Sequence, residues 1–209
     1  MDKEKLKRFI EIAKKNGLGK SDYTNSITTN WIVFTGTFSA GKTTLVKDVA
    51  ESLGVHFHQE PARVFIEKQL QSGRTNSEIW ADVASTVMPI HSLRVDLESS
   101  LNPQQILILD TAIPDTLPYA LLYGVNPHDI IKASHIYRYK EPIFLVEPLA
   151  FQTDEVRNSN TQERMALHYL RKKIYMTLGY SIVSIPVLDR IGRRDFVHRC
   201  LDERQKNCK

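Results

Sequence analysis

The stretch WIVFTGTFSAGKTTL, residues 31–45, joins an apolar run, a glycine-containing loop and the start of a helical pattern. Residues 36–43 within it match the pattern GxxxxGK[ST], which marks a phosphate-binding loop when a strand precedes it and a helix follows. The glycines let backbone N–H groups converge on phosphate oxygens, and the helix adds the positive end of its dipole. The stretch therefore predicts a strand, a loop and a helix that together bind a nucleoside triphosphate.

Two side chains of this loop have predicted roles beyond backbone binding. Lys42 reaches the β- and γ-phosphates as a point charge, and Thr43 offers its hydroxyl to Mg²⁺. We expect ATP with Mg²⁺ as the ligand, with GTP as the alternative nucleotide. The predicted nucleotide-binding residues are Gly36, Thr37, Phe38, Ser39, Ala40, Gly41, Lys42, Thr43 and Thr44.

Asp110 is the second predicted metal-directing residue. It ends the apolar run QILILD, residues 105–110, as a magnesium-directing Asp does in a P-loop protein. A helix cap is the alternative role, because Asp favours that position. The next residue is Thr111, where most motor ATPases carry a catalytic Glu, and no NKxD motif of a GTPase is present. These features favour a transferase over a motor or a switch.

Outward from the loop, short apolar runs alternate with longer helical patterns. Continuous runs such as ILIL and IFLV suit parallel strands that are covered on both faces. The alternation predicts a doubly wound α/β domain with a mainly parallel five-stranded sheet, in which ligands bind beyond the carboxyl ends of the strands. The predicted strands are residues 31–36, 55–59, 105–110, 142–148 and 180–186, and the predicted helices are 43–53, 61–72, 76–99, 114–124, 127–135, 160–178 and 188–205.

The first 30 residues are expected to be an appendage to a kinase-like domain of residues 31–209. Residues 3–16 place Leu6, Phe9, Ile10 and Ala13 at helical spacing, which predicts an amphipathic helix. Residues 21–30 form a polar connector. Such a helix usually packs on its own domain. A homodimer or a regulatory partner bound through residues 1–30 is the alternative.

Composition narrows the class of protein. The 209 residues, with 42% hydrophobic and 25% charged residues, fit one soluble domain. The net charge of +4 is dispersed among acids, which makes a nucleic-acid partner unlikely. Two cysteines are too few for a disulfide framework, and no apolar run reaches the length of a signal peptide or a membrane span. We therefore expect a cytoplasmic protein without a transmembrane segment.

Several segments together resemble a known family. They are FTGTFSAGKTTL (34–45), QEPAR (59–63), ILDTAIPDTLPYALLYG (108–124), EPLAFQTDEVR (147–157), ERMALHYL (163–170) and GYSIVSIPV (179–187). In this order they resemble the NadR/Ttd-like group of P-loop ATPases, which includes ribosylnicotinamide kinase domains. The resemblance implies a nucleoside-kinase-like fold, ATP with Mg²⁺ and a small-molecule phosphate acceptor. Some members of the group are instead GTP-binding regulators.

A polar stretch after the fourth predicted strand reads as a lid. It carries Arg157, and Arg164 follows near the start of the predicted helix 160–178. Arginines on a mobile lid can neutralise charge on the transferring phosphoryl group and exclude water. The alternative is a solvated helix start, with Arg164 in a surface ion pair.

Glu60 and Asp115 are the candidate general bases. Glu60 follows the second predicted strand, and Asp115 lies five residues beyond Asp110. A base must stand within hydrogen-bond reach of the acceptor hydroxyl. Glu60 has two further alternatives, which are to hold magnesium-bound water or to pair with Arg63. Both acids could instead complement a helix dipole.

Two further groups of residues lie outside these motifs. Arg190, Arg193 and Arg194 follow the last predicted strand, near the expected nucleotide base, on which one guanidinium could stack. The family resemblance favours Arg193, and a solvated basic face is the alternative for these arginines. Trp80, Met88, His91 and Leu93 lie on the 76–99 segment and are expected to face the core, because apolar residues at helical spacing normally point inward.

The sequence as a whole predicts a phosphotransferase that acts on a small molecule, with a nucleoside such as nicotinamide riboside as one acceptor. The alternative is a nucleotide-binding regulator that hydrolyses slowly and signals by closing its lid.

Overall fold

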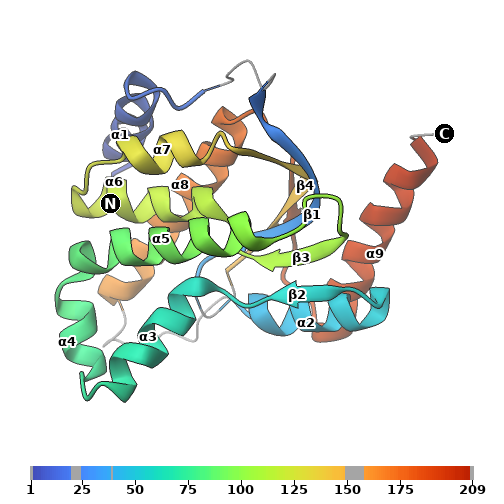
Figure 1. Ribbon diagram of the computed structural model, residues 1–209, viewed down its shortest axis with the longest axis horizontal. Coiled ribbons are helices and arrows are strands. Elements are labelled where there is room, and N and C mark those ends of the chain that lie inside the picture. The colour runs from blue at the N-terminus through green and yellow to red at the C-terminus, as the bar shows by residue number, and fades with distance from the viewer. Residues whose placement is uncertain (1, 20–24, 39, 149–157, 208–209) are drawn as a thin grey trace.

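The computed structural model describes residues 2–19, 25–38, 40–148 and 158–207. Five strands form one sheet in the order β2-β3-β1-β4-β5, and every neighbouring pair is parallel (Figure 1). The strands are β1 (Ile27–Gly36), β2 (His56–His58), β3 (Leu107–Asp110), β4 (Tyr137–Val146) and β5 (Ile182–Ile185). The predicted doubly wound α/β fold is confirmed, with a sheet that is parallel throughout.

The register of the strands brings the predicted site to one edge of the sheet. Phe34 of β1 pairs with Asp110 of β3, and Gly36 pairs with Val146 of β4. His58, two residues before Glu60, pairs with Leu109. Because parallel strands end at the same edge, the phosphate loop, Asp110 and Glu60 all follow carboxyl ends that lie side by side.

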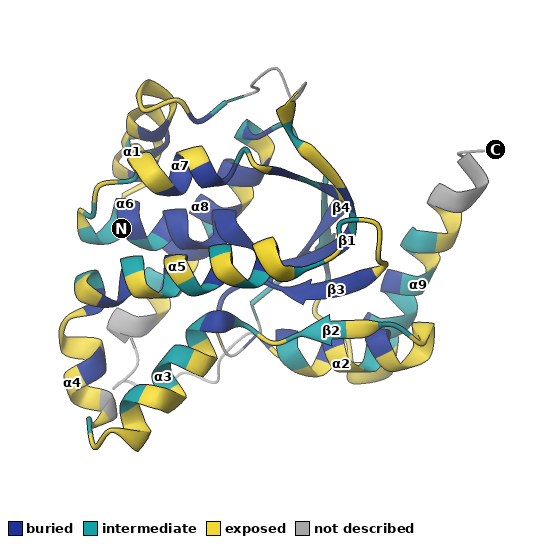
Figure 2. Cartoon of the chain, viewed as in Figure 1, coloured by how far each residue is buried: buried dark blue, intermediate teal, exposed yellow. Residues whose placement is uncertain are grey.

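Helices cover both faces of the sheet (Figure 1). Successive side chains of a strand point to opposite faces, so Trp31 and Val33 join one apolar cluster while Ile32 and Phe34 join another. Figure 2 shows the resulting buried layers. The face with Ile32 and Phe34 is covered by α2 (Lys42–Leu53) and α9 (Arg190–Asn207). The face with Trp31 and Val33 is covered by α5 (Val83–Ser100), the 3₁₀ helix η2 (Ile113–Thr116), α6 (Leu117–Tyr123), α7 (His128–Ala133) and α8 (Asn158–Thr177).

The N-terminal helix α1 (Lys3–Lys15) packs on α8 and α6, as predicted for an amphipathic helix next to its own domain. Leu6, Ile10 and Ala13 are buried in the same apolar cluster as the sheet. The carboxylate of Asp2 caps the helix by accepting from the N–H of Glu4 at 3.2 Å. Within the described ranges, no helix combines the length and the apolar character needed to cross a bilayer.

Several predicted boundaries are wrong, among them the start of β4, which lies at Tyr137 and not at residue 142. β1 begins at Ile27, so residues 27–30 of the predicted connector belong to the sheet, where Ile27 pairs with Tyr137 of β4. Main-chain pairing with β4 holds this polar segment extended, which side-chain hydropathy does not reveal. The predicted helix 76–99 is divided at Asp82 (φ −130°, ψ 69°) into α4 (Asn76–Ala81) and α5. Together with α3 (Pro61–Gln71), α4 packs on α5 beside the site.

Candidate active site

The phosphate loop runs from the end of β1 to the start of α2. A side chain at Gly36 would meet the carbonyl oxygen of Val146 at 2.9 Å, so the close approach of β1 to β4 requires glycine there. Gly41 begins α2 with φ +75°, and no side chain caps the helix. Its first N–H groups are therefore left for a ligand. Thr37 is buried, and its hydroxyl has no hydrogen-bond partner in the described part of the chain.

These features fit an anionic ligand. Phosphate oxygens would accept hydrogen bonds from the uncapped N–H groups that follow the left-handed glycine, and from the unsatisfied buried hydroxyl. Ala40 is buried, whereas Phe38 and Thr44 are exposed. Ser39 lies outside the described residues.

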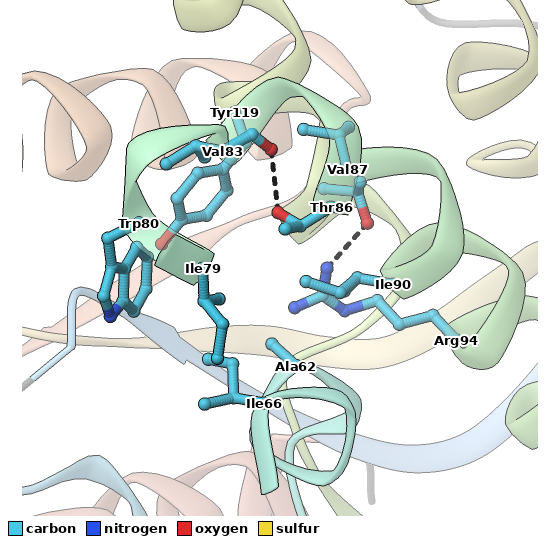
Figure 3. A pocket seen from close by; sticks show the side chains of 11 residues that line it. Ala62, Ile66, Ile79, Trp80, Val83, Thr86, Val87, Ile90, Arg94 and Tyr119 are labelled. Atoms are coloured by element: carbon cyan, nitrogen blue, oxygen red, sulfur yellow. Dashed lines mark hydrogen bonds between the residues drawn. The ribbon is translucent and has the colours of Figure 1, made fainter. Parts of the chain in front are cut away.

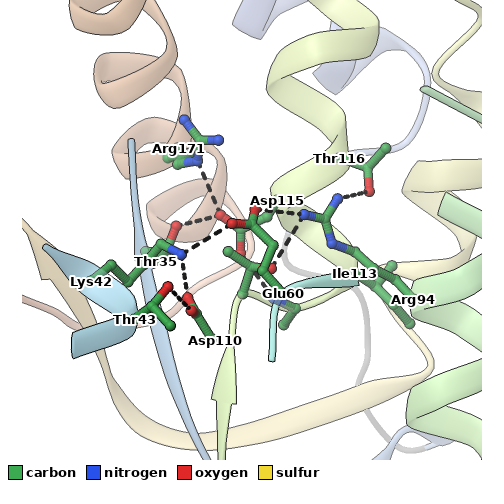
Figure 4. Close-up of polar contacts among 12 residues, drawn as sticks. Thr35, Lys42, Thr43, Glu60, Arg94, Asp110, Ile113, Asp115, Thr116 and Arg171 are labelled. Carbon is green, nitrogen blue, oxygen red and sulfur yellow. Dashed lines mark hydrogen bonds and ion pairs between the residues drawn. The ribbon is translucent and has the colours of Figure 1, made fainter. Parts of the chain in front are cut away.

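Lys42, Thr43 and Asp110 meet at the carboxyl ends of β1 and β3 (Figure 4). The Thr43 hydroxyl donates to Oδ2 of Asp110 at 2.7 Å, and the Lys42 ammonium contacts Oδ1 of the same carboxylate. The Lys42 and Asp110 side chains are 5% and 0% exposed. Two adjacent hard oxygen donors, a hydroxyl and a carboxylate, are of the kind that Mg²⁺ takes beside phosphate oxygens. The predicted residues are thus brought together in a geometry that fits the metal.

The electrostatics of this pair depend on its burial. Burial disfavours the charged form of Lys42, but Glu60 and Asp110 outweigh it and raise the Lys42 pKa. Burial raises the pKa of Asp110, and the nearby Lys42 charge opposes that shift. The lysine therefore stays cationic beside two acids.

Glu60 connects the phosphate loop to a second region of the site. It lies between β2 and α3, and no hydrogen bond from its side chain caps that helix. Oε2 is 3.4 Å from the Lys42 ammonium, and Oε1 is 3.4 Å from Nη2 of Arg94. Burial alone would raise the Glu60 pKa, but Lys42, Arg94 and Arg171 lower it. Its side chain remains 25% exposed, so one ionised carboxylate stands open between two cations.

Asp115 is enclosed. Its Oδ1 accepts from the Thr35 hydroxyl and from Nε of Arg171 at 3.1 Å. Its Oδ2 accepts from the N–H of Ala112 at 3.0 Å and from the Tyr175 hydroxyl at 2.7 Å. With 0% exposure and two donors on each oxygen, its lone pairs are filled. This environment suits a structural anchor for η2.

The predicted arginines lie on both sides of the phosphate loop. Arg164 of α8 is buried, and its guanidinium stands 5.5 Å from the centroid of the Phe38 ring. Arg193 of α9 donates from Nη1 to the carbonyl of Ala40 at 2.7 Å. Arg157 lies outside the described residues.

A pocket adjoins Glu60 between α3, α4, α5 and η2 (Figure 3). Arg94 and Thr116 form its polar end, with Arg94 Nη1 donating to the Thr116 hydroxyl at 2.6 Å. Trp80 stands at the other end and is 50% exposed, so its predicted core position is wrong. Its helix α4 turns away from α5 at Asp82, which removes Trp80 from the apolar stripe. The remaining lining residues are Ala62, Ile66, Ile79, Val83, Thr86, Val87, Ile90 and Tyr119.

Sequence reasoning missed Arg94 and Arg171. Val83, Val87, His91, Arg94 and Glu98 follow one another at helical spacing and are all buried on α5. This stripe begins apolar and ends polar, a change that signals charged groups on the inward face. Arg171 similarly stands between Leu170 and Ile174 on the buried side of α8.

Comparison with known proteins agrees with this geometry. Residues 31–193 match a family model described as an AAA domain. The chain belongs to this AAA domain family. No curated protein sequence matches it. The resemblance to NadR/Ttd-like P-loop proteins is confirmed at the level of family and fold.

Solved structures share the nucleotide-kinase-like P-loop fold of this AAA domain. NadR protein in complex with NR is 22% identical, with a TM-score of 0.57 over 82% of this chain and 50% of that one. NadR protein in complex with NAD and AMP-PNP is 22% identical, with a TM-score of 0.59 over 88% and 50%. Thymidylate kinase from Ehrlichia chaffeensis is 16% identical, with a TM-score of 0.58 over 83% and 98%. The AAA domain thus spans half the length of the NadR chains it matches.

Proposed function

We propose that this AAA domain transfers the γ-phosphoryl group of ATP to a hydroxyl of a small molecule in the cytoplasm. The observation that carries the proposal is the position of Glu60. One oxygen of its carboxylate lies 3.4 Å from Lys42 of the phosphate loop, and the other lies 3.4 Å from Arg94 of the pocket. A kinase needs a group at the junction of its nucleotide and acceptor sites, and Glu60 occupies such a junction.

The nucleotide half follows from the phosphate loop. Backbone N–H groups of residues 36–44 bind the phosphates, and Lys42 turns from its carboxylate partners to the β- and γ-oxygens. Thr43 and Asp110 would hold Mg²⁺, which would neutralise phosphate charge. Arg164, next to Phe38, stands where a cation can approach the transferring group. Arg157 keeps its predicted lid role as part of this proposal.

The acceptor half is the pocket beside Glu60. Its apolar wall and its single polar end suit a small molecule with a flat apolar part and a hydroxyl. Glu60 accepts the proton of that hydroxyl, and Arg94 holds the carboxylate in place. Asp115, already saturated with donors, anchors η2 and does not act as the base. The NadR and thymidylate kinase neighbours support a nucleoside-like acceptor, and nicotinamide riboside is the first to test.

The test is ADP release from ATP and Mg²⁺ across a panel of nucleosides, ribosylated vitamins and sugars. The Lys42→Ala variant should abolish turnover, and Lys47→Ala should not, because Lys47 is exposed on the same helix. One acceptor that raises ADP release well above the water background supports the kinase. Tight nucleotide binding with no acceptor effect would refute it.

A regulatory role is the second candidate, and one contact favours it. Helix α1 packs on α8, the helix that carries Arg164 and Arg171. A partner or a second copy that displaces α1 would thereby reach the nucleotide site. Nucleotide-dependent association of the full chain, lost when residues 1–19 are removed, would support this role.

A further inference from the structure

Helix α9 runs along α2, the helix that begins at the phosphate loop, and contacts it through polar groups at three levels. Arg190 forms two hydrogen bonds of 2.7 Å with the carboxylate of Asp48. His198 lies 2.6 Å from the Ser52 hydroxyl. Arg193 reaches the loop itself and donates from Nη1 to the carbonyl of Ala40 at 2.7 Å. The phosphate loop is therefore held in place by α9, a helix more than 140 residues later in the chain.

Arg193 differs from the other two contacts in its burial and its charge balance. The residue is only 5% exposed. Its Nε and Nη2 groups are buried and have no hydrogen-bond partner among residues 2–19, 25–38, 40–148 and 158–207. No carboxylate of these residues forms an ion pair with it. Burial accordingly lowers its pKa. A buried cation without a counter-charge is unfavourable unless something else supplies the negative charge.

The contact with Ala40 has a geometric consequence. The peptide unit between Ala40 and Gly41 is planar and trans, so its C=O and N–H point in opposite directions. A donor that fixes the carbonyl on one side directs the Gly41 N–H to the other side, toward the interior of the loop. Gly41 itself is left-handed (φ +75°), and because glycine has no side chain to restrict φ, this peptide can rotate when nothing holds it.

We propose that Arg193 is a positioning residue of the phosphate loop, which fixes the Ala40–Gly41 peptide and whose charge is balanced by phosphate bound in the loop. The inference rests on the proposed nucleotide site. It differs from the role that the family resemblance suggests, which is stacking on the nucleotide base. The guanidinium lies against the loop carbonyl and is buried there, and it is not presented on the surface as a stacking platform.

Inorganic tripolyphosphate distinguishes these two roles because it has phosphates but no base. The variant is Arg193→Met, which keeps the apolar stem and removes the charge and the donors. The matched control is Arg190→Met, on the same helix, whose side chain is 71% exposed and bonds α2 but not the loop. Dissociation constants of tripolyphosphate and of ATP are measured with Mg²⁺ by calorimetry, together with the melting temperature of the free protein.

Arg193→Met should weaken tripolyphosphate and ATP by about tenfold each, because an electrostatic contact to the loop is lost. Arg190→Met should stay within about twofold, as expected for an exposed ion pair. The melting temperature of free Arg193→Met should not fall, since an uncompensated buried charge is removed. A merely structural contact would give the opposite, a lower melting temperature with unchanged affinities.

Wild-type affinity of Arg193→Met for tripolyphosphate overturns the inference, and a loss confined to ATP assigns Arg193 to the base. If Arg193→Met does not fold, Arg193→Gln is used instead, because glutamine keeps a donor but carries no charge. Arg193→Gln should lose several-fold affinity for tripolyphosphate, and wild-type affinity again overturns the inference.

The Lys42→Ala variant separates the two proposals. If Lys42→Ala abolishes binding while Arg193→Met binds both ligands with wild-type affinity, only the inference fails. If the wild-type chain binds neither ligand, the nucleotide site fails and the inference with it.

Discussion

Glu60 and Asp115 are two carboxylates of one site with opposite surroundings. Glu60 is a quarter exposed and stands between Lys42 and Arg94 with its partners at 3.4 Å. Asp115 is fully buried and accepts two hydrogen bonds on each oxygen. Chain position presents both as candidate bases, but only Glu60 keeps lone pairs and space for a substrate proton. Accessibility and saturation, more than proximity to the phosphate loop, separate a reactive acid from a structural one.

The largest expected effect comes from removing Asp115, the enclosed acid. Asp115→Ala should lower the free energy of unfolding by about 3–5 kcal/mol, because it leaves Arg171 buried without its carboxylate. Urea denaturation followed by circular dichroism measures the loss. Asp96→Ala, an exposed acid on α5, should stay within about 0.5 kcal/mol of wild type. Equal midpoints for Asp115→Ala and wild type would mean that the enclosure has no structural value.

The open acid should show the reverse pattern. Glu60→Gln should reduce acceptor-dependent turnover at saturating substrates by roughly 100-fold, the usual range for a lost general base. It should cost less stability than Asp115→Ala, because Asp110 still pairs with Lys42 and the amide oxygen still accepts from Arg94. The control is Glu67→Gln, exposed on α3. Turnover at the wild-type rate would remove Glu60 from the chemistry.

Glu98 is another buried acid and, like Asp115, belongs to the structural side of the comparison. Glu98 accepts from the N–H of Ile113 at 2.7 Å and from the Tyr139 hydroxyl at 2.6 Å, and burial raises its pKa from 4.5 to about 8. A raised folded-state pKa contributes stability that is complete below pH 4.5 and is lost as the pH rises through about 8. The wild-type free energy of unfolding should therefore decline between pH 5 and pH 9.

The decline should be at least about 1.4 kcal/mol, the free energy of one pKa unit. Glu98→Gln should flatten it, since the amide does not titrate. Urea titrations of both proteins at several pH values measure the two slopes. Parallel slopes would show that another group causes the pH dependence.

The smallest effect concerns the pocket beside Glu60. Trp80→Ala should raise KM for the acceptor about tenfold and leave kcat nearly unchanged, as expected when uniform binding is lost. The melting temperature should not move, because half of the side chain is exposed. Val64→Ala, exposed on α3 but outside the pocket lining, is the control. An unchanged KM would place the acceptor elsewhere.

Much of this arrangement could be predicted from the sequence. The five strands, the phosphate loop and the meeting of Lys42, Thr43 and Asp110 follow from local patterns, because hydropathy and a spaced motif are properties of neighbouring residues. The early start of β1 at Ile27 could not be predicted in this way, since it depends on pairing with Tyr137, far along the chain.

The pocket side of the site is harder to predict for the same reason. Arg94 gives no motif, and its role appears only when α5, η2 and the β2–α3 turn come together. The choice between Glu60 and Asp115 likewise required the donors around each oxygen. Trp80 was misplaced because a break at Asp82 ends the helical periodicity that suggested a core position.

Thr111 links the two halves of the site, and its backbone carries a cost. Among the described residues it is the one non-glycine residue with positive φ, at +75°, a conformation that costs about 1–3 kcal/mol. Its N–H donates to Phe34 at 2.9 Å, and its hydroxyl accepts from Arg94 at 3.2 Å. The turn directs Asp110 toward Lys42 and Thr43 of the phosphate loop and Thr111 toward Arg94 of the pocket. Laboratory selection for heat resistance would favour glycine here, but glycine would lose the hydroxyl that accepts from Arg94. Backbone strain and the tie between the phosphate loop and the pocket are therefore balanced at a single residue.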